Sequence, residues 1–300
     1  MDANTTHPPR ERITLIGHEG NALVGDLYVP AGEDRLGAVI LLHGGGQTRH
    51  SWRATAAELA QRGWVAISMD QRGHGDSAWI ESKNYQFEDF SNDLAAIAGQ
   101  IEEKFGSRPV AIGASLGGIA AMLAEGESDT QVLTAAILVD VTPRMKHDGV
   151  EKIIGFMSER AGHGFASLDE AADAIAEYLP HRPRPKNLSG LAKNLRLGPD
   201  KRYRWHWDPE FLSESNRKAE RAEREIFYQR LEEAVQTITI PLMLVRGRES
   251  ELVDEAMVAH FLELAPHAKY ADVSDAGHMV AGDKNDIFTD AVLGFLDQQA

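Results

Sequence analysis

The sequence predicts an α/β protein built on a mostly parallel, eight-stranded sheet, with helices on both faces and an inserted helical segment. Three observations support this fold class. Short and almost wholly apolar runs alternate with longer segments of helical periodicity, which is the pattern of a parallel sheet covered on both faces. The first two strand-like runs alternate polar and apolar residues instead. A block over residues 144–237 has helical stretches but no strand-like runs.

The first half of the chain presents the expected elements in order. Residues 12–30, "RITLIGHEGNALVGDLYVP", indicate two antiparallel strands joined by a turn at "HEGN". The runs "GAVILL", "WVAISM", "PVAIG" and "LTAAILVDV" are rich in β-branched residues and leucine, and predict buried strands. Between these runs, "HSWRATAAELAQRG" and "FEDFSNDLAAIAGQIEEKF" predict helices, and Gly63 is expected to cap the first of them.

The same alternation resumes near the end of the chain. Strands are expected at "IPLMLVRG" and "AKYADV", and helices at "DEAMVAHFLELAP" and "DIFTDAVLGFLDQ". The block between holds two helical stretches, a proline-rich stretch and a charged helix over residues 216–233 that is expected to present a solvated face. The chain therefore divides into a core of residues 1–143 and 238–300 and an insertion of residues 144–237 after the sixth strand.

Composition excludes several classes of function. A formal charge of −15 disfavours nucleic acid and anionic membrane surfaces, both of which attract basic patches. The absence of cysteine removes disulfides, thiolate metal sites and cysteine nucleophiles. The N-terminal stretch has no secretory pattern, and no apolar run is long enough to span a bilayer. We expect a cytoplasmic protein, monomeric or homodimeric, that acts on a small molecule.

A single serine stands at a crowded position in "PVAIGASLGGIAAML". Residues Gly113 to Gly117 fit the pattern G-x-S-x-G, in which the serine occupies a strained turn between a strand and a helix. Small neighbours suit such a turn because it brings the two backbones close together. An apolar strand precedes Ser115 and a helical run follows it. Ser115 is therefore the predicted nucleophile.

A serine hydroxyl needs a base and donors for the developing oxyanion. Of the 12 histidines, His278 lies between the last strand and the last helix and is the predicted base. His43 and His74 are expected to serve structural or hydrogen-bonding roles. The "HGGG" loop after a buried strand matches the loop type that supplies a backbone N–H to the oxyanion hole. The predicted donors are the amides of Gly45, in this loop, and of Leu116, which follows the serine.

The glycine loop also resembles a phosphate-binding loop, but the G-K-[ST] ending is missing, so nucleotide binding is disfavoured. No H-E-x-x-H pattern or comparable ligand spacing is present, and the chemistry requires neither metal nor cofactor.

Taken in order, "HGGG", "DQRGHGDS", "GASLGG" and "AGH" resemble the α/β-hydrolase superfamily, and the resemblance covers essentially the whole chain. It implies a triad in the chain order serine, acid, histidine, and it identifies the insertion with the cap of many members. A cap-bearing serine esterase or lactonase is the member that the chain is most similar to. Ser115 stands where dehalogenases and epoxide hydrolases of this fold have an aspartate, which argues against both activities.

The acid of the triad has two candidates. Most relatives carry an aspartate after the strand that matches "PLMLVRG", where this chain has "RGRESELVDE", and Glu251 aligns with it. Some members place the acid after the preceding strand, where Asp140 stands. A carboxylate at the end of a buried strand needs a partner, either His278 or Arg144. Glu251 is preferred, with Asp140 as the alternative.

The insertion is expected to select the substrate. Trp205, His206 and Trp207, together with Gly44 beside the serine loop, are the predicted substrate-binding residues. An aromatic wall favours an ester or lactone with a fairly bulky apolar part. The alternatives are a carbon–carbon bond hydrolase or a cofactor-free perhydrolase on the same triad, and then a non-catalytic binding protein of this fold.

Overall fold

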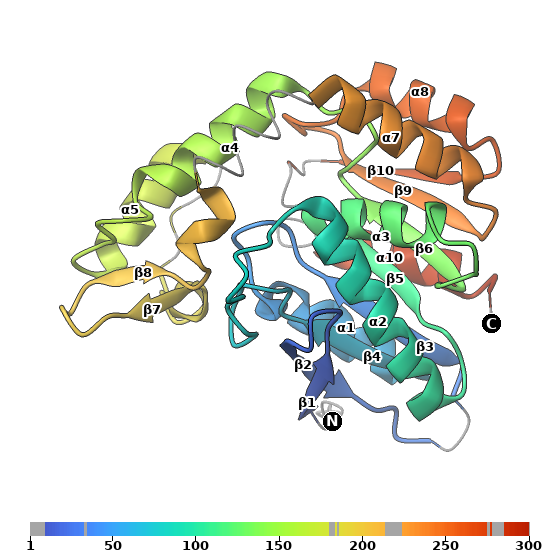
Figure 1. Cartoon of the computed structure of the whole chain (residues 1–300), viewed down its shortest axis with the longest axis horizontal. Coiled ribbons are helices and arrows are strands. Elements are labelled where there is room, and N and C mark those ends of the chain that lie inside the picture. Colours follow the sequence, from blue (N-terminus) through green and yellow to red (C-terminus); the bar gives the residue numbers. More distant parts are fainter. Residues whose placement is uncertain are drawn as a thin grey trace, which may run out of the picture.

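The structure is a computed structural model. It describes residues 10–32, 35–179, 184, 186–213, 224–274, 277 and 285–299. Their strands form one eight-stranded sheet in the order β1-β2-β4-β3-β5-β6-β9-β10 (Figure 1). The bounds are β1 Arg10–Ile16, β2 Ala22–Tyr28, β3 Gly37–Leu42, β4 Trp64–Met69, β5 Val110–Ala114, β6 Ala135–Val139, β9 Leu242–Gly247 and β10 Lys269–Val273. Only β2 runs opposite to the other strands, so the predicted mostly parallel sheet is confirmed.

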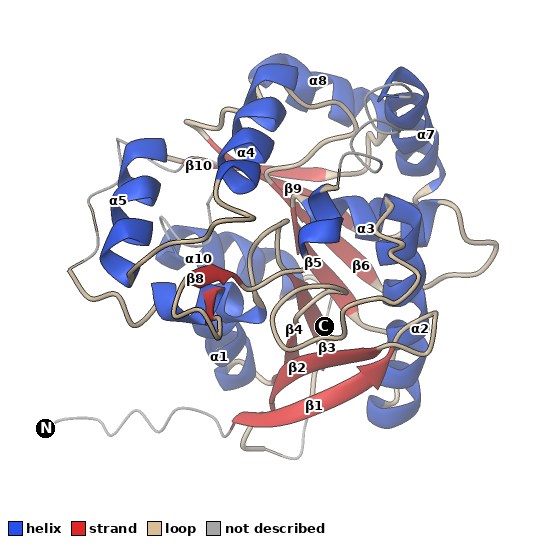
Figure 2. Cartoon of the chain, turned by 60° about the vertical axis from the view of Figure 1, so that its left-hand side comes forward, coloured by secondary structure: helices blue, strands red, loops and turns tan. Residues whose placement is uncertain are grey.

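Helices cover both faces of the sheet (Figure 2). Those of the core are α1 Arg53–Gln61, α2 Phe87–Phe105, α3 Leu116–Gly126, α7 Arg224–Thr237, α8 Glu255–Leu264 and α10 Asn285–Leu296. The apolar residues of α1 and α10 join one core cluster, and those of α2, α3, α7 and α8 join the other. None of the described helices is long and apolar enough to cross a lipid bilayer.

The central strands are apolar along their whole length because both of their faces are buried. In β3, Val39 and Leu41 pack into the cluster that contains α1 and α10, whereas Ile40 and Leu42 pack into the other cluster. The helix before β4 ends close to the expected residue. Arg62 caps α1, and Gly63 follows in the left-handed region with φ of 96°.

The block between β6 and β9 contains α4 (His147–Glu159) and α5 (Leu168–Tyr178), which match the two expected helical stretches. The expectation that this block lacks strands was wrong. Residues Leu195–Leu197 form β7, which pairs antiparallel with β8 (Tyr203–Trp205). Three-residue strands offer too few positions for a periodic pattern to be recognised. Short 3₁₀ helices occupy Arg49–Trp52, Leu191–Asn194 and Pro209–Leu212.

Helix α7 belongs to the layer that contains α3. The Oγ1 atom of Thr237 donates to the carbonyl of Gly126 at 2.5 Å, and a Cβ atom at Gly126 would lie 2.2 Å from the carbonyl oxygen of Ala234. Ala234 and Leu231 are buried. The charged helix was expected to be a solvated face, but α7 thus buries one side against the core. Residues 216–223 of that expected helix lie outside the described residues.

The inserted block is joined to the core by backbone hydrogen bonds. The N–H of Gly75 donates to the carbonyl of His206 at 2.7 Å, and the N–H of Asp208 donates to the carbonyl of Gly73 at 2.7 Å. Between these bonds His74 and Trp207 form an isolated antiparallel bridge. The loop of residues 73–75 therefore positions the part of the insertion that follows β8.

Candidate active site

Ser115 connects β5 to α3 in a strained backbone conformation. Its φ of 46° and ψ of −112° lie outside the regions that residues with a side chain normally adopt. The carbonyl of Ser115 accepts from the N–H of Gly118 and of Ile119 at 2.9 Å, and its own N–H donates to Val139 at 3.2 Å. The strain is thus held by the first turn of α3 and by the neighbouring strand β6.

The glycines around Ser115 are required by close backbone approach. A Cβ atom at Gly113 would lie 2.4 Å from the carbonyl carbon of Gly117. One at Gly117 would lie 2.6 Å from the carbonyl oxygen of Leu42 in β3. Distances under 3 Å leave no room for a side chain. The turn therefore folds only because the helix and two strands meet without side chains between them.

Two backbone amides near Ser115 are available to a ligand. The N–H of Leu116 is in the first turn of α3, where the helix itself supplies no acceptor. In the glycine loop, the N–H of Gly44 donates to Gln47 Oε1 at 3.2 Å and that of Gly46 donates to His74 Nε2 at 3.1 Å. Within the described part of the chain, the N–H of Gly45 makes no such bond.

Two buried histidines support the loops at this edge of the sheet. His43 Nε2 accepts from the N–H of Gln71 at 3.1 Å, and its Nδ1 lies 2.8 Å from the carbonyl of Gly44. His74 lies 5.1 Å from His43, measured between ring centres. Burial lowers the pKa of His43 to about 4. Burial also lowers the pKa of His74, to about 3, with a further contribution from the neighbouring His43. Both rings are therefore neutral at physiological pH, which fits the structural roles expected for them.

The predicted base, His278, lies outside the described residues. Asp140 lies at the carboxyl end of β6, fully buried and with a left-handed φ of 52°. Its N–H donates to the carbonyl of Val245 at 2.7 Å. Its Oδ1 accepts from the N–H of Gly247 at 3.1 Å, and its Oδ2 accepts from Ser250 Oγ at 2.7 Å. These bonds provide each oxygen of the buried carboxylate with a hydrogen-bond donor.

Arg144 is not the partner of Asp140 that the sequence suggested. Its guanidinium bonds to Glu232 at 2.6 Å and to Glu225 at 2.7 Å, both of which belong to α7. Arg144 therefore lies against α7 instead of the end of β6. It ties the start of the insertion to α7.

Glu251 follows β9 but faces a pocket. Its Oε1 lies 3.5 Å from the hydroxyl of Tyr178 in α5 and 3.8 Å from Lys152 Nζ in α4. Burial, with a further contribution from Glu251, raises the pKa of Tyr178 well above its usual value. The two candidate acids thus have different surroundings: Asp140 is held by β9 and its following loop, whereas Glu251 contacts the insertion.

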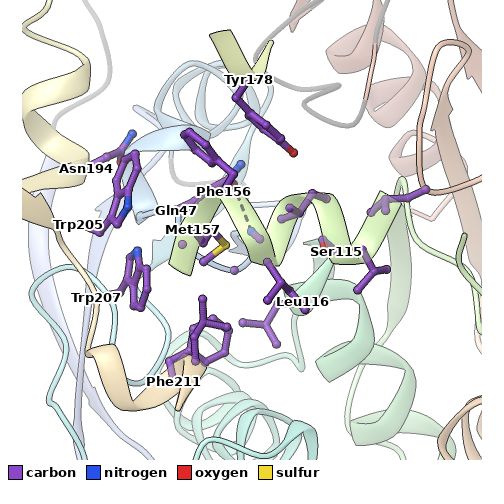
Figure 3. Close-up of a pocket in the computed structure, with 18 of the residues that line it drawn as sticks. Gln47, Ser115, Leu116, Phe156, Met157, Tyr178, Asn194, Trp205, Trp207 and Phe211 are labelled. Carbon is purple, nitrogen blue, oxygen red and sulfur yellow. Dashed lines mark hydrogen bonds between the residues drawn. The ribbon is translucent and has the colours of Figure 1, made fainter. Parts of the chain in front are cut away.

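The pocket has a volume of about 340 Å³ and lies between the serine loop and the insertion (Figure 3). Ser115 and Leu116 lie at one side, and Trp205 and Trp207 lie across from them. The wall is mainly apolar. Besides these four residues it includes Gly44, Gly45, Ile119, Ile153, Ile154, Phe156, Met157, Tyr178, Phe211 and Leu252.

The three neighbouring residues expected to bind substrate separate onto two sides. Trp205 ends β8, and Trp207 follows two positions later on the same side, so both line the pocket. His206 points the other way, with its Nε2 atom 4.0 Å from Asp76 Oδ1, and the described pocket wall does not include it. His206 was expected to bind substrate together with the two tryptophans. Side chains alternate in direction along an extended chain, so it faces away from the pocket that they line.

Several residues of the pocket were missed from the sequence. Asn194 and Gln47 contribute amide groups to the wall, and Asn194 Oδ1 accepts from Thr48 Oγ1 at 2.8 Å. Tyr178 also lines the wall, where its ring stacks on Phe156 with ring centres 4.2 Å apart. No motif marks these residues, because they come from helices and loops that meet only after folding.

The chain is similar to known proteins over most of its length. The model of the family described as serine aminopeptidase, S33, matches residues 33–285. Esterase Rv0045c of Mycobacterium tuberculosis is 29% identical over 269 residues, which cover 86% of this chain and 82% of the relative. An sn-1-specific diacylglycerol lipase of Mus musculus is 26% identical over 288 residues, which cover 92% of this chain and 84% of the relative.

A solved structure shows the same architecture. An α/β hydrolase from Novosphingobium aromaticivorans superimposes with a TM-score of 0.77 at 25% identity, covering 97% of this chain and 99% of that protein. The superposition therefore extends over almost the full length of both chains, including the sheet, its helices and the block between β6 and β9.

Proposed function

The chain belongs to the family described as serine aminopeptidase, S33, within the α/β-hydrolase superfamily, and from this premise we propose that it hydrolyses carboxylic esters through Ser115. One observation carries the proposal: Ser115 occupies a strained strand–helix turn and lines an apolar pocket. The similarity to an esterase and to a diacylglycerol lipase favours an ester over a peptide as the substrate.

The reaction follows from the groups around Ser115. Its Oγ attacks the carbonyl carbon while the proton passes to His278, the proposed base. The amides of Leu116 and Gly45 bind the oxyanion, each contributing about 3 kcal/mol of transition-state stabilisation. His278 then protonates the departing alcohol as the ester C–O bond breaks. Water, activated by the same imidazole, cleaves the acyl–Ser115 ester and releases the acid.

We propose Asp140 as the acid, in place of the Glu251 preferred from the sequence. Both oxygens of Asp140 are held by donors from β9 and its following loop, which keeps the carboxylate oriented. Glu251 contacts Tyr178 and Lys152 of the insertion. Because Glu251 lines the pocket, its carboxylate is better placed to contact the substrate than to orient the imidazole.

The substrate that the pocket favours is an ester or lactone with a fairly bulky apolar part. Aromatic side chains from three parts of the insertion, Phe156, Tyr178 and Trp205, form one side of the cavity. Burying an apolar part of the substrate against them is favourable by roughly 25 cal/mol for each Å² of apolar surface removed from water. The cavity of about 340 Å³ is large enough for an extended acyl chain or a ring system.

The insertion is proposed to act as the cap of this pocket. Residues 144–213 provide most of the wall that faces Ser115. The expected boundary at residue 237 would add α7, but that helix packs against α3 in the core. We therefore assign the cap to the part of the insertion before α7.

The proposal is tested with p-nitrophenyl esters of graded acyl length and a matched set of lactones. Wild type is expected to be most active on medium-length apolar substrates, and the S115A variant to lose at least a thousandfold in kcat. A fluorophosphonate probe should label wild type and not S115A. Labelling of S115A, or ester turnover that S115A retains, would contradict the assignment.

The assignment of the acid has its own test. D140N is expected to lower kcat by about 10³-fold or more, because the imidazole loses its orienting partner. E251Q should act mainly on KM and keep kcat within about fivefold of wild type. The opposite ranking of the two variants would return the role to Glu251.

A further inference from the structure

Ser250 makes a set of hydrogen bonds that fixes the direction of its hydroxyl proton. Its Oγ atom accepts from the N–H of Leu252 and from that of Val253, each at 3.0 Å. The same atom lies 2.7 Å from Asp140 Oδ2. Two accepted bonds use both lone pairs of the hydroxyl oxygen, and its single proton is then left for Asp140.

The turn that carries Ser250 also supplies the second donor to the carboxylate. The N–H of Ser250 donates to the carbonyl of Gly247 at 3.0 Å, which closes a turn directly after β9. From the start of that turn, the N–H of Gly247 donates to Asp140 Oδ1 at 3.1 Å. One turn of four residues therefore holds each oxygen of the carboxylate with a separate donor.

Asp140 needs such support because its backbone is strained and its side chain is buried. A left-handed φ of 52° is unfavourable for a residue with a side chain, and a fully buried carboxylate is costly unless its oxygens are hydrogen-bonded. The short bond from a hydroxyl to a carboxylate is among the stronger hydrogen bonds of proteins. Removing it would leave Oδ2 without its Ser250 donor while Gly247 still holds Oδ1, so the carboxylate would be less firmly oriented.

We propose that Ser250 is a positioning residue, whose hydroxyl fixes the Asp140 carboxylate in the orientation that the reaction requires. This inference rests on the proposed function, in which Asp140 orients the catalytic imidazole. It adds a fourth side chain, from the loop after β9, to a site otherwise described as a triad. Ser250 acts through Asp140 and has no contact with the reacting atoms in this scheme.

The test combines substitutions at Ser250 with D140N, using the best p-nitrophenyl ester. S250A and the near-isosteric S250C, which offers only a weak S–H donor, should lower kcat about tenfold with KM within twofold of wild type. S250T keeps a hydroxyl and should recover most of the lost kcat. S189A, at an exposed serine, is the control and should match wild type.

A double-mutant cycle separates positioning from a general effect on folding. In the D140N background, S250A should lower kcat by less than twofold, because the group that Ser250 positions is already lost. Circular dichroism and thermal melting establish that each variant is folded, and S250C replaces S250A if the alanine variant is not.

Wild-type kcat in S250A and S250C, or an equal loss in both backgrounds, would overturn this inference while leaving the esterase proposal intact. Full activity of D140N would overturn the inference together with the assignment of the acid. Ester turnover by S115A would reject the proposed function itself.

Discussion

The N–H of Gly46 donates a hydrogen bond to Nε2 of the fully buried His74, across 3.1 Å. Because Nε2 is the acceptor, the proton of the neutral ring is on Nδ1, which lies 2.8 Å from the carbonyl of Arg72. The ring also packs edge-on against Phe211, with ring centres 4.9 Å apart. A neutral imidazole thereby fixes the glycine loop next to Ser115.

Replacing His74 with phenylalanine should loosen this loop. H74F keeps an aromatic ring but removes the acceptor of the partly buried Gly46 N–H, which costs about 1 kcal/mol. We expect kcat on esters to fall roughly tenfold and the melting temperature to fall by several degrees. H18F, at an exposed histidine, is the matched control, and steady-state kinetics with thermal melting provide the measurement. An unchanged kcat in H74F would exclude a role for His74 in holding the loop.

Stability should fall as the pH falls below the ordinary pKa of histidine. Burial lowers the pKa of His74 to about 3 and that of His43 to about 4, whereas in the unfolded chain both are near 6.5. Below that pH the unfolded state binds protons that the folded state excludes. The stabilisation is therefore fully present above about pH 6.5 and is lost progressively down to about pH 3–4.

Urea unfolding at pH 7, 6 and 5 measures this dependence. Each buried histidine contributes a slope of about 1 kcal/mol in the free energy of unfolding per pH unit, over the lower part of that range. H74F should therefore show a shallower dependence than wild type, even though it is less stable at pH 7. Parallel curves for the two proteins would contradict the prediction.

The glycine at position 113 should tolerate no side chain. In G113A the new methyl group would lie 2.4 Å from the carbonyl carbon of Gly117, and moving α3 away would disturb the whole serine turn. We expect a loss of about 3 kcal/mol or more in unfolding free energy, or failure to fold. Gly99, within α2, has open space around its Cα, so G99A should be neutral or stabilising by up to about 1 kcal/mol. Chemical denaturation compares the two, and equal stabilities would refute the packing argument.

Filling the pocket should discriminate between short and long substrates. Ile154 lies on α4 and lines the cavity, so I154W would occupy part of the space available to an acyl chain. We expect kcat/KM for p-nitrophenyl octanoate to fall at least ten times more than for the acetate. The ratio of the two constants, compared with wild type, is the readout. An equal effect on both esters would mean that the acyl chain binds elsewhere.

The sheet was predictable because its signals are local and repeated. A strand buried on both faces has to be apolar at every position, as in β3, and each such run was recognisable by itself. The turn at Ser115 was predictable for a related reason. Its glycines are demanded by contacts within a few residues of the serine and with one neighbouring strand.

The choice between Asp140 and Glu251 depended on side-chain direction, which spacing along the sequence does not define. The turn from Gly247 to Ser250 directs a backbone N–H and a hydroxyl toward Asp140 and leaves the next residue, Glu251, facing the pocket. His206 illustrates the opposite case. Alternation along an extended chain already separates it from Trp205 and Trp207, so that rule alone would have excluded it from the pocket.

The loop of residues 73–75 has one neighbour on each side: the glycine loop, through His74, and the chain after β8, through His206 and Asp208. A shift in either neighbour is therefore transmitted to the other across a single tight bend. The proposed substrate pocket and the proposed oxyanion donor in the glycine loop therefore depend on the same short loop. Under the proposed function, variants meant to change the specificity can alter α4 and α5 but have to keep the bridge between His74 and Trp207.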